Sequence, residues 1–515
     1  MAGATSGGAG GGGRGAGGGG QPAGGGAVGA AAPRDPAGAV TAELQGGVAR
    51  GAFPGGAAAF GRGAGAPACV ARAAGTFTFD VQSLPTGARS VFDAASLTKV
   101  LATTGALMVL HDQGLLRLDA PVAQAVPAFS GGDKDKVTAR MLLSHTGGLR
   151  EWFPFHRVPG LQGAEDVVAR VCADPLKYPP GGEPHYSDLG FILLGRLVEV
   201  LSGQPLDAFC RERLFRPLGM AQTGFRRAED VRWDPQVVPT EVDPERGLIW
   251  GEVHDPLAFV MGGVAGHAGL FTSALDAARF ARCLLSGGAC PDSGRAVFRP
   301  ETVRLFAAPC ARGRAKKPRA LGWDLAARYS PSPGGQRMGG RTFGHLGFTG
   351  TSMWVDPDAG TYVVLLTNAV HPSAESKRAN LILGVRPKVA DAAMDALAAG
   401  GLAGRESWVP EEDGEAGSAA AGGAGPPASS SGRGGFASPP PAPGAGGPEG
   451  LRGGGAGVAA GARLALARAA GKAGRLLARG VRGFPPWLGR AWNRGGEDAA
   501  PRVTARLRPP SPPPG

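Results

Sequence analysis

The chain has 515 residues, enough for one large domain or roughly two to three ordinary ones, and its formal net charge is +12. Residues 451–515 carry twelve basic and two acidic side chains, so this tail supplies +10 of that charge and the rest of the chain is nearly neutral. We therefore expect no nucleic acid as a partner of the folded domain. The basic tail, by contrast, has the charge to contact polyanions or an acidic membrane surface.

Glycine and proline, with 90 and 45 residues, are concentrated near the two ends of the chain. Residues 1–41 are rich in Gly and Ala, residues 406–460 in Gly, Ser and Pro, and residues 461–515 form a basic low-complexity tail. Such segments bury too little apolar surface to offset the entropy of ordering. We expect them to be disordered and the folded domain to span residues 42–405. No signal-peptide pattern and no run of 18 apolar residues is visible, which leaves the compartment open.

Hydrophobic periodicity and turn residues predict the elements in chain order. Residues 42–82 are expected to form weak strands with turns, and residues 95–112 a buried helix that stops at Gly114. The later expectations are a short helix ended by Gly147, a helix over 188–201, an irregular stretch over 221–262, a helix capped by Ser273, a hairpin with strands at 351–355 and 361–367, and a last helix over 388–399.

The order of these elements predicts an α+β fold. We expect one antiparallel sheet, flanked by helices, in which the first strands join the last hairpin and an all-helical lobe is inserted between them. The six cysteines form no CxxC pair and match no metal-site spacing, so we expect free thiols rather than disulfides, no metal and no cofactor. Glu252, His254 and Asp255 fit no helix face, and we interpret them as hydrogen-bonding groups of a loop near the cleft.

One serine and one lysine interrupt the apolar segment "DAASLTKVLATTGALMVL". Ser96 and Lys99 are three residues apart and therefore share one face of the predicted helix. A buried lysine loses solvation, which favours its neutral form and lets it accept a proton. A serine beside such a base is an activated nucleophile. The S-x-x-K spacing is common, so it becomes specific only together with further motifs.

Two further segments supply those motifs. "PHYSDLGFILLG" places Tyr186 and Asp188 before an apolar helix, and "FGHLGFTGTSMWVDP" places His345 before the hairpin. In this order S-x-x-K, Y-S-D and H-L-G resemble the three motifs of the serine β-lactamase and penicillin-binding-protein superfamily. The resemblance covers about residues 42–385 and is greatest to the class C-like branch, which includes esterases and D-aminopeptidases. It implies the β-lactamase/transpeptidase-like form of the α+β fold.

The resemblance implies a role for each residue of the first two motifs. Ser96 would attack the carbonyl carbon and form an acyl-enzyme. Lys99 would accept the serine proton, and Tyr186 would share this work and relay a proton to the leaving group. Asp188 stands where many members have Asn. An ionised carboxylate only accepts hydrogen bonds, so Asp188 would stabilise protonated Lys99 and weaken the contact with a substrate amide.

The third motif implies the substrate side of the site. His345 stands where β-lactamases and DD-peptidases have the lysine that meets the substrate carboxylate. A histidine is mostly neutral at pH 7, which favours neutral acyl substrates, and its contact with substrate would make turnover change at about pH 6–7. Gly347 would let the strand approach the substrate closely. The backbone N–H groups of Ser96 and Phe348 would form the oxyanion hole.

These observations predict a serine hydrolase that acts through an acyl-enzyme on a small-molecule ester or amide. One alternative is a β-lactamase or D-Ala-D-Ala carboxypeptidase. An alternative of another class is a catalytically inactive binding or scaffold protein, which the residue types of Asp188 and His345 would suit. His145 and His267 resemble family positions that support the site, and we interpret both as structural. The family is often periplasmic or exported.

Overall fold

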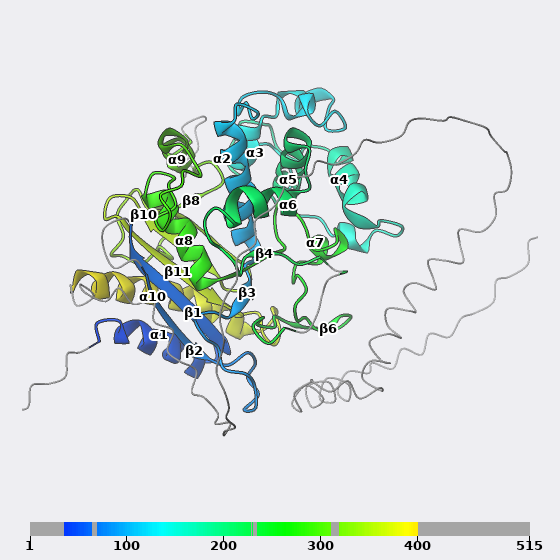
Figure 1. Cartoon of the computed structure of the whole chain (residues 1–515). Coiled ribbons are helices and arrows are strands. Elements are labelled where there is room, and N and C mark those ends of the chain that lie inside the picture. The colour runs from blue at the N-terminus through cyan, green and yellow to red at the C-terminus, as the bar shows by residue number, and fades with distance from the viewer. Residues whose placement is uncertain (1–34, 64–68, 228, 230–233, 311–318, 400–515) are drawn as a thin grey trace, which may run out of the picture.

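A six-stranded antiparallel sheet organises the chain in the computed structural model, which describes residues 35–63, 69–227, 229, 234–310 and 319–399 (Figure 1). In spatial order its strands are β2 (Val70–Gly75), β1 (Gly55–Arg62), β11 (Thr361–Thr367), β10 (Ser352–Asp356), β9 (Phe343–Leu346) and β8 (Asp324–Leu325). The first strands thus join the last hairpin, and the predicted α+β class is confirmed. The segments predicted to be disordered lie outside the described residues, apart from residues 35–41.

The central strands are buried on both faces, and their side chains alternate between two cores. Successive residues of a strand point to opposite faces of the sheet. Ala59 and its cross-strand partner Val364 belong to one hydrophobic cluster, whereas Ala58 and its partner Leu365 belong to the other. A strand that is covered on both faces needs small or apolar residues at every position, which explains the alanine run of β1.

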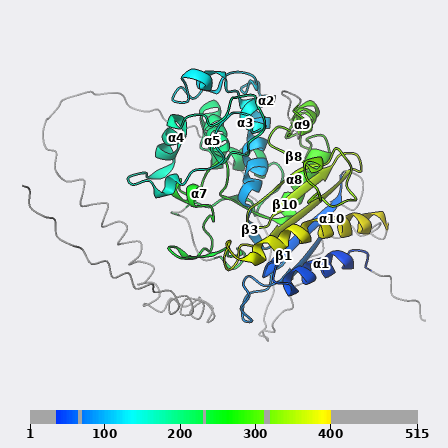
Figure 2. The same ribbon diagram turned by 180° about the vertical axis from the view of Figure 1, so that it is seen from behind.

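Helices cover both faces of this sheet (Figures 1 and 2). α1 (Gly38–Ala49) and α10 (Ile382–Ala398) pack together on one face, and α8 (Ala274–Leu285) packs on the other. The side chain of Ser273 accepts a hydrogen bond from the N–H of Asp276, which confirms the predicted cap of α8.

The two ends of the domain differ from the prediction. Residues 42–49 are helical, so the expectation of strands from residue 42 is wrong there. Val40, Leu44 and Gly47 are buried at helical spacing, and this stripe packs on the sheet face. The last helix begins at Ile382 rather than 388, with Pro387 inside it.

Most of the segment between β2 and β8, apart from α8, builds the second lobe. Its main helices are α2 (Gly105–Asp112), α3 (Ala139–Leu143), α4 (Gly163–Ala173), α5 (Asp188–Ser202), α6 (Leu206–Cys210), α7 (Pro256–Val260) and α9 (Pro300–Ala307). It also carries two small sheets, so the lobe is mainly rather than wholly helical. They are formed by β3 (Val91–Asp93), β7 (Leu270–Ser273) and β4 (Gly224–Phe225), and by β5 (Val242–Asp243) and β6 (Gly247–Leu248). The stretch 221–262, expected to be irregular, contains three of these short strands and α7.

Two expectations drawn from composition can be compared with the structure. All six cysteines are free thiols, as predicted. Over the part of the chain that the structure describes, no single helix is long and apolar enough to cross a membrane. One pair, Asp188–Ser202 with Leu206–Phe215, reaches the required length only with a bend of 74° between its members.

Candidate active site

Ser96 lies on a short 3₁₀ turn, η1 (Ala95–Leu97), directly after β3. Ala95 has a φ of 47°, which lies in the left-handed region that residues other than Gly seldom adopt. The carboxylate of Asp93 holds this conformation, because its Oδ1 accepts the N–H of Ala95 at 2.8 Å. Backbone strain of this kind persists only where the surrounding structure enforces it, and it is frequent at active sites.

Lys99 begins a π-helical segment, η2 (Lys99–Thr104), which continues into α2. The predicted helix over 95–112 is therefore present, but only its second half is α-helical. Lys99 Nζ donates to Ser96 Oγ at 3.0 Å and to the carbonyl of His267 at 2.9 Å, and it lies 2.7 Å from Asp188 Oδ1. These three contacts match the three donors of an ammonium group.

The charge of Lys99 is set by two opposing effects. Its side chain is fully buried, and burial, the largest single effect, lowers the pKa, but the interactions with Asp188 and, to a lesser degree, Tyr186 together raise it to about 12. The expectation that burial favours neutral Lys99 is therefore wrong, because an anion replaces the lost water. The contact between Lys99 and Asp188 agrees with the expectation that Asp188 stabilises protonated Lys99.

Tyr186 lies in the second lobe, two residues before the start of α5, and its side chain contacts Ser96. Its hydroxyl donates to Ser96 Oγ at 2.9 Å. Burial raises the pKa of the phenol, and the positive charge of Lys99 only partly opposes this effect. The resting group is thus a neutral phenol beside a lysine cation.

The ring of His145 packs against the ring of Tyr186. Its ring centroid lies 4.7 Å from that of Tyr186, and its Nδ1 accepts the backbone N–H of Ser187 at 3.0 Å. Its carbonyl accepts the N–H of His185. Burial lowers the pKa of His145 well below its ordinary value, so the neutral ring remains an acceptor. These contacts agree with a structural role for His145.

His345 lies on β9 and faces the tyrosine, with its ring centroid 5.9 Å from that of Tyr186. Burial lowers its pKa to about 4, and the cations of Lys99 and Arg319 act in the same direction. Its Nδ1 lies 2.8 Å from the carbonyl of Leu346, which only accepts, so Nδ1 carries the proton and Nε2 has the lone pair. His345 is therefore neutral at pH 7, and any change in turnover that it causes is expected at about pH 4 rather than at about pH 6–7.

A tight turn over residues 347–351 follows β9 and brings Phe348 to the serine segment. Thr349 Oγ1 donates to the carbonyl of Asp93 at 2.9 Å, and Thr351 Oγ1 donates to that of Ala94 at 3.0 Å. A Cβ at Gly347 would lie 2.7 Å from the Ala94 carbonyl and would clash with Thr351 Oγ1. Gly347 thus permits close contact between the turn and the residues that precede Ser96.

The side chain of Phe348 stands at the outer edge of this turn. It is 67% exposed, and its ring packs against the ring of His254 with centroids 5.7 Å apart. His254 Nε2 lies 2.7 Å from Glu241 Oε2, and the N–H of His254 donates to Asp93 Oδ2 at 2.7 Å. The buried Asp93 carboxylate therefore connects the serine segment to the loop that flanks Phe348.

Glu252, His254 and Asp255 do not converge on a common point. Glu252 pairs with Arg246, His254 with Glu241, and Asp255 with His267 at 2.9 Å. Across the described ranges, no group of three His, Cys, Asp or Glu side chains is arranged to hold a metal ion. The loop interpretation of these three residues is confirmed, and the contact with Asp255 orients the histidine whose carbonyl binds Lys99.

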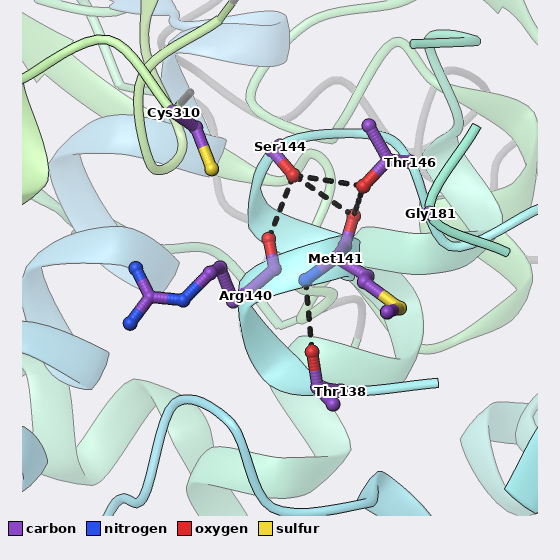
Figure 3. Close-up of a pocket in the computed structure, with 7 residues that line it drawn as sticks. All are labelled: Thr138, Arg140, Met141, Ser144, Thr146, Gly181 and Cys310. Atoms are coloured by element: carbon purple, nitrogen blue, oxygen red, sulfur yellow. Dashed lines mark hydrogen bonds between the residues drawn. The ribbon is translucent and has the colours of Figure 1, made fainter. Parts of the chain in front are cut away.

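A separate small pocket lies beside α3 and does not include the serine site (Figure 3). Ser144 Oγ there is already bonded to the carbonyl of Arg140 at 2.8 Å and to Thr146 Oγ1 at 3.0 Å. Its lining residues are Thr138, Arg140, Met141, Ser144, Thr146, Gly181 and Cys310. We assign no catalytic role to this pocket.

Comparison with known proteins identifies the family of this chain. The profile of the Beta-lactamase family matches residues 40–385. The chain belongs to the Beta-lactamase family. As a member of that family it is a serine hydrolase. An Escherichia coli K12 protein, provisionally named a D-alanyl-D-alanine carboxypeptidase, is 33% identical over 315 residues, which are 56% of this chain and 71% of that protein.

Solved structures show the same fold. A penicillin-binding protein homologue from Caulobacter crescentus matches with a TM-score of 0.55 and 20% identity, over 70% of this chain and 98% of its own. A hydrolase with promiscuous acyltransferase activity matches with a TM-score of 0.53 and 22% identity, over 69% of this chain and 99% of its own. At these identities the likeness concerns the fold alone.

Three residues of this Beta-lactamase family member were missed in the sequence. Asp93 directly precedes the serine segment, and a short polar residue at that place was the available signal. Arg319 is buried with its guanidinium 5.3 Å from the centre of the Tyr186 ring, and it pairs with Asp324. Arg386 is buried on α10. Neither arginine has a sequence signal, because an arginine between apolar residues of a helix or loop is usually exposed.

Proposed function

We propose that this hydrolase cleaves neutral carboxylic esters or small amides by forming an acyl-enzyme on Ser96. The observation that carries this proposal is the neutral, buried His345 at the position of the lysine in the third motif. Without a fixed cation there, the site loses an attraction for substrate carboxylates, whereas an uncharged acyl group needs none. Phe348, largely exposed beside the serine segment, provides an apolar surface for such a group.

The proton path is proposed from the two donors to Ser96 Oγ. Lys99 is charged and cannot accept the serine proton directly, so it stabilises negative charge on the oxygen. Once its O–H has turned from Ser96 Oγ to the leaving-group atom, Tyr186 accepts the serine proton as the bond from Oγ to the acyl carbon forms. Its own proton passes to the leaving-group atom as the bond between that atom and the acyl carbon breaks. Water then attacks the acyl carbon, Tyr186 relays the water proton to Oγ, and the bond between Oγ and the acyl carbon breaks to release the acid. The N–H groups of Ser96 and Phe348 would hold the oxyanion in both steps.

The proposal is tested by turnover of a p-nitrophenyl ester and by labelling with a fluorophosphonate probe. We expect Ser96→Ala to lose both signals and Tyr186→Phe to lose most turnover, by about 10²–10⁴-fold. Ser130→Ala, an exposed serine outside the site, serves as the control. Equal turnover by Ser96→Ala and the unaltered protein would refute the nucleophile, and an inactive scaffold would show neither turnover nor labelling.

A D-Ala-D-Ala carboxypeptidase or β-lactamase is the second candidate. The name carried by the Escherichia coli relative, 33% identical, favours the carboxypeptidase. Release of D-alanine from an acyl-D-Ala-D-Ala peptide, faster than hydrolysis of the neutral ester, would favour this candidate over the esterase. Hydrolysis of nitrocefin would identify the β-lactamase.

A further inference from the structure

Arg386, a buried arginine on helix α10, forms hydrogen bonds to the turn over residues 347–351. Arg386 lies on α10 among buried apolar residues and is 6% exposed. One of its terminal nitrogens, NH2, donates to the carbonyl of Gly347 at 2.9 Å and to that of Thr351 at 3.1 Å. Burial lowers its pKa to about 10, so the guanidinium stays charged at neutral pH. Burying a cation costs free energy, which is offset here by bonds to two carbonyls of one turn.

The first of these carbonyls belongs to a particular peptide unit. The C=O of Gly347 and the N–H of Phe348 are the two ends of the same planar amide. A cation bonded to the oxygen withdraws electron density from the amide and makes its N–H a stronger donor, since linked hydrogen bonds polarise one another. A low-dielectric surrounding increases this effect.

The turn is also fixed from the opposite side. Thr349 and Thr351 donate to the carbonyls of Asp93 and Ala94, the two residues before the 3₁₀ turn of Ser96. Arg386 therefore hydrogen-bonds to a turn that is itself hydrogen-bonded to the residues before Ser96. The relative position of the Ser96 and Phe348 N–H groups depends on both sets of bonds.

We propose that Arg386 is a positioning residue that aligns and polarises the Phe348 N–H for the oxyanion. This inference rests on the proposed function, because it assumes that this N–H receives the oxygen of the acyl group. Arg386 itself contacts neither the serine nor the substrate in this proposal. Its effect must therefore appear where charge develops on the carbonyl oxygen and must be small in substrate binding.

A matched pair of substrates separates this role from a merely structural one. A thionoester places sulfur where the ester has its carbonyl oxygen, and sulfur accepts hydrogen bonds weakly. We expect Arg386→Met to lower kcat for a p-nitrophenyl ester by about 10–100-fold with KM nearly unchanged. The thionoester should lose much less, so the ratio of ester to thionoester turnover falls. Arg386→Lys keeps the charge and should restore most of that ratio.

The control is Lys388→Met, which removes an exposed cation two residues away on the same helix. It should keep the unaltered ratio. An equal loss for both substrates in Arg386→Met would overturn the inference. If Arg386→Met does not fold, Arg386→Gln against Arg386→Lys decides, because equal ratios in these two would also overturn it. Failure of the proposed function is separate: the unaltered protein would then show no probe labelling at Ser96.

Discussion

A fully buried lysine remains charged only where an anion replaces the water it has lost. For Lys99 that anion is Asp188, 2.7 Å away, which together with Tyr186 outweighs burial and raises the lysine pKa to about 12. An asparagine at this place would hydrogen-bond the lysine without supplying charge. In the proposed mechanism Asp188 therefore determines which group exchanges protons with Ser96, because Tyr186 is then the only hydrogen-bonding neighbour of Oγ in the described site that is neutral at rest.

Replacing Asp188 by Asn tests whether Asp188 keeps Lys99 protonated. Burial of Lys99 would then be opposed only by its interactions with Tyr186, and we expect the pKa of Lys99 to fall. If the cation is required, kcat/KM of the variant for a neutral ester falls as pH rises through this lowered pKa. The unaltered protein should retain its activity over the same range, because its Lys99 loses the proton only near pH 12.

Glu199→Gln, on the same helix and paired with Arg196, is the control and should follow the unaltered profile. The opposite result would be informative. Greater activity of Asp188→Asn at neutral pH, with a rise as pH increases, would show that neutral Lys99 is the base and that Tyr186 only assists.

At the scale of elements, the turn over residues 347–351 sets the distance between β9 and the serine segment. We predict that Gly347→Ala lowers kcat by about 10²-fold or more, because its Cβ would contact the Ala94 carbonyl and displace the Phe348 N–H. The clash involves backbone on one side, so we also expect a loss of about 1–3 kcal/mol in the free energy of unfolding. Turnover and thermal unfolding measure the two effects.

Gly340→Ala is the matched control for this substitution. Gly340 lies in the turn before β9, is exposed, and has no atom within 4 Å of the position of an added Cβ. It should leave both turnover and unfolding unchanged. If Gly347→Ala were equally silent, the turn would tolerate displacement and its bonds to Asp93 and Ala94 would have no functional weight.

The elements differ in how much of them could be predicted from the sequence. The hairpin of β10 and β11, the helix α5 and the capped helix α8 have local signals: alternation, apolar periodicity and a serine cap. The helix α1 was missed because its small residues, Gly46 among them, are typical of turns, and its burial depends on α10, which follows more than 300 residues later in the chain. Ser96, Lys99 and Tyr186 were predicted from the resemblance of their motifs to those of a family, and the structure brings the three side chains together.

The remaining features of the site depend on tertiary contacts that no local pattern encodes. The charge of Lys99 could not follow from its own segment, since the compensating Asp188 is distant in the chain. The pKa of His345 depends on burial, and the bond from Arg386 to Gly347 depends on how α10 crosses the sheet. Resemblance to family motifs can thus point to candidate reacting side chains, whereas their protonation and alignment require the assembled fold.

At the scale of the whole molecule, the site belongs to one of the two cores. Leu97 and the helices of the second lobe contribute to the hydrophobic cluster on one sheet face, and α1 with α10 contributes to the cluster on the other. We propose that residues 35–399 form the catalytic domain, because this range contains the sheet, the helices on both faces and every residue of the site. In this proposal helix α1 contributes to the stability of the domain but not to catalysis.

Two truncated chains test this division. Residues 35–399 should keep the kcat and the unfolding temperature of the full chain. Residues 51–399 lack α1, which uncovers the sheet face beneath Val40 and Leu44, and we expect a loss of roughly 3–6 kcal/mol in stability from these two side chains. The fraction that remains folded should keep its kcat, because α1 and the serine segment belong to different hydrophobic clusters on opposite faces of the sheet. An inactive but folded 35–399 chain would instead show that residues beyond these limits complete the site.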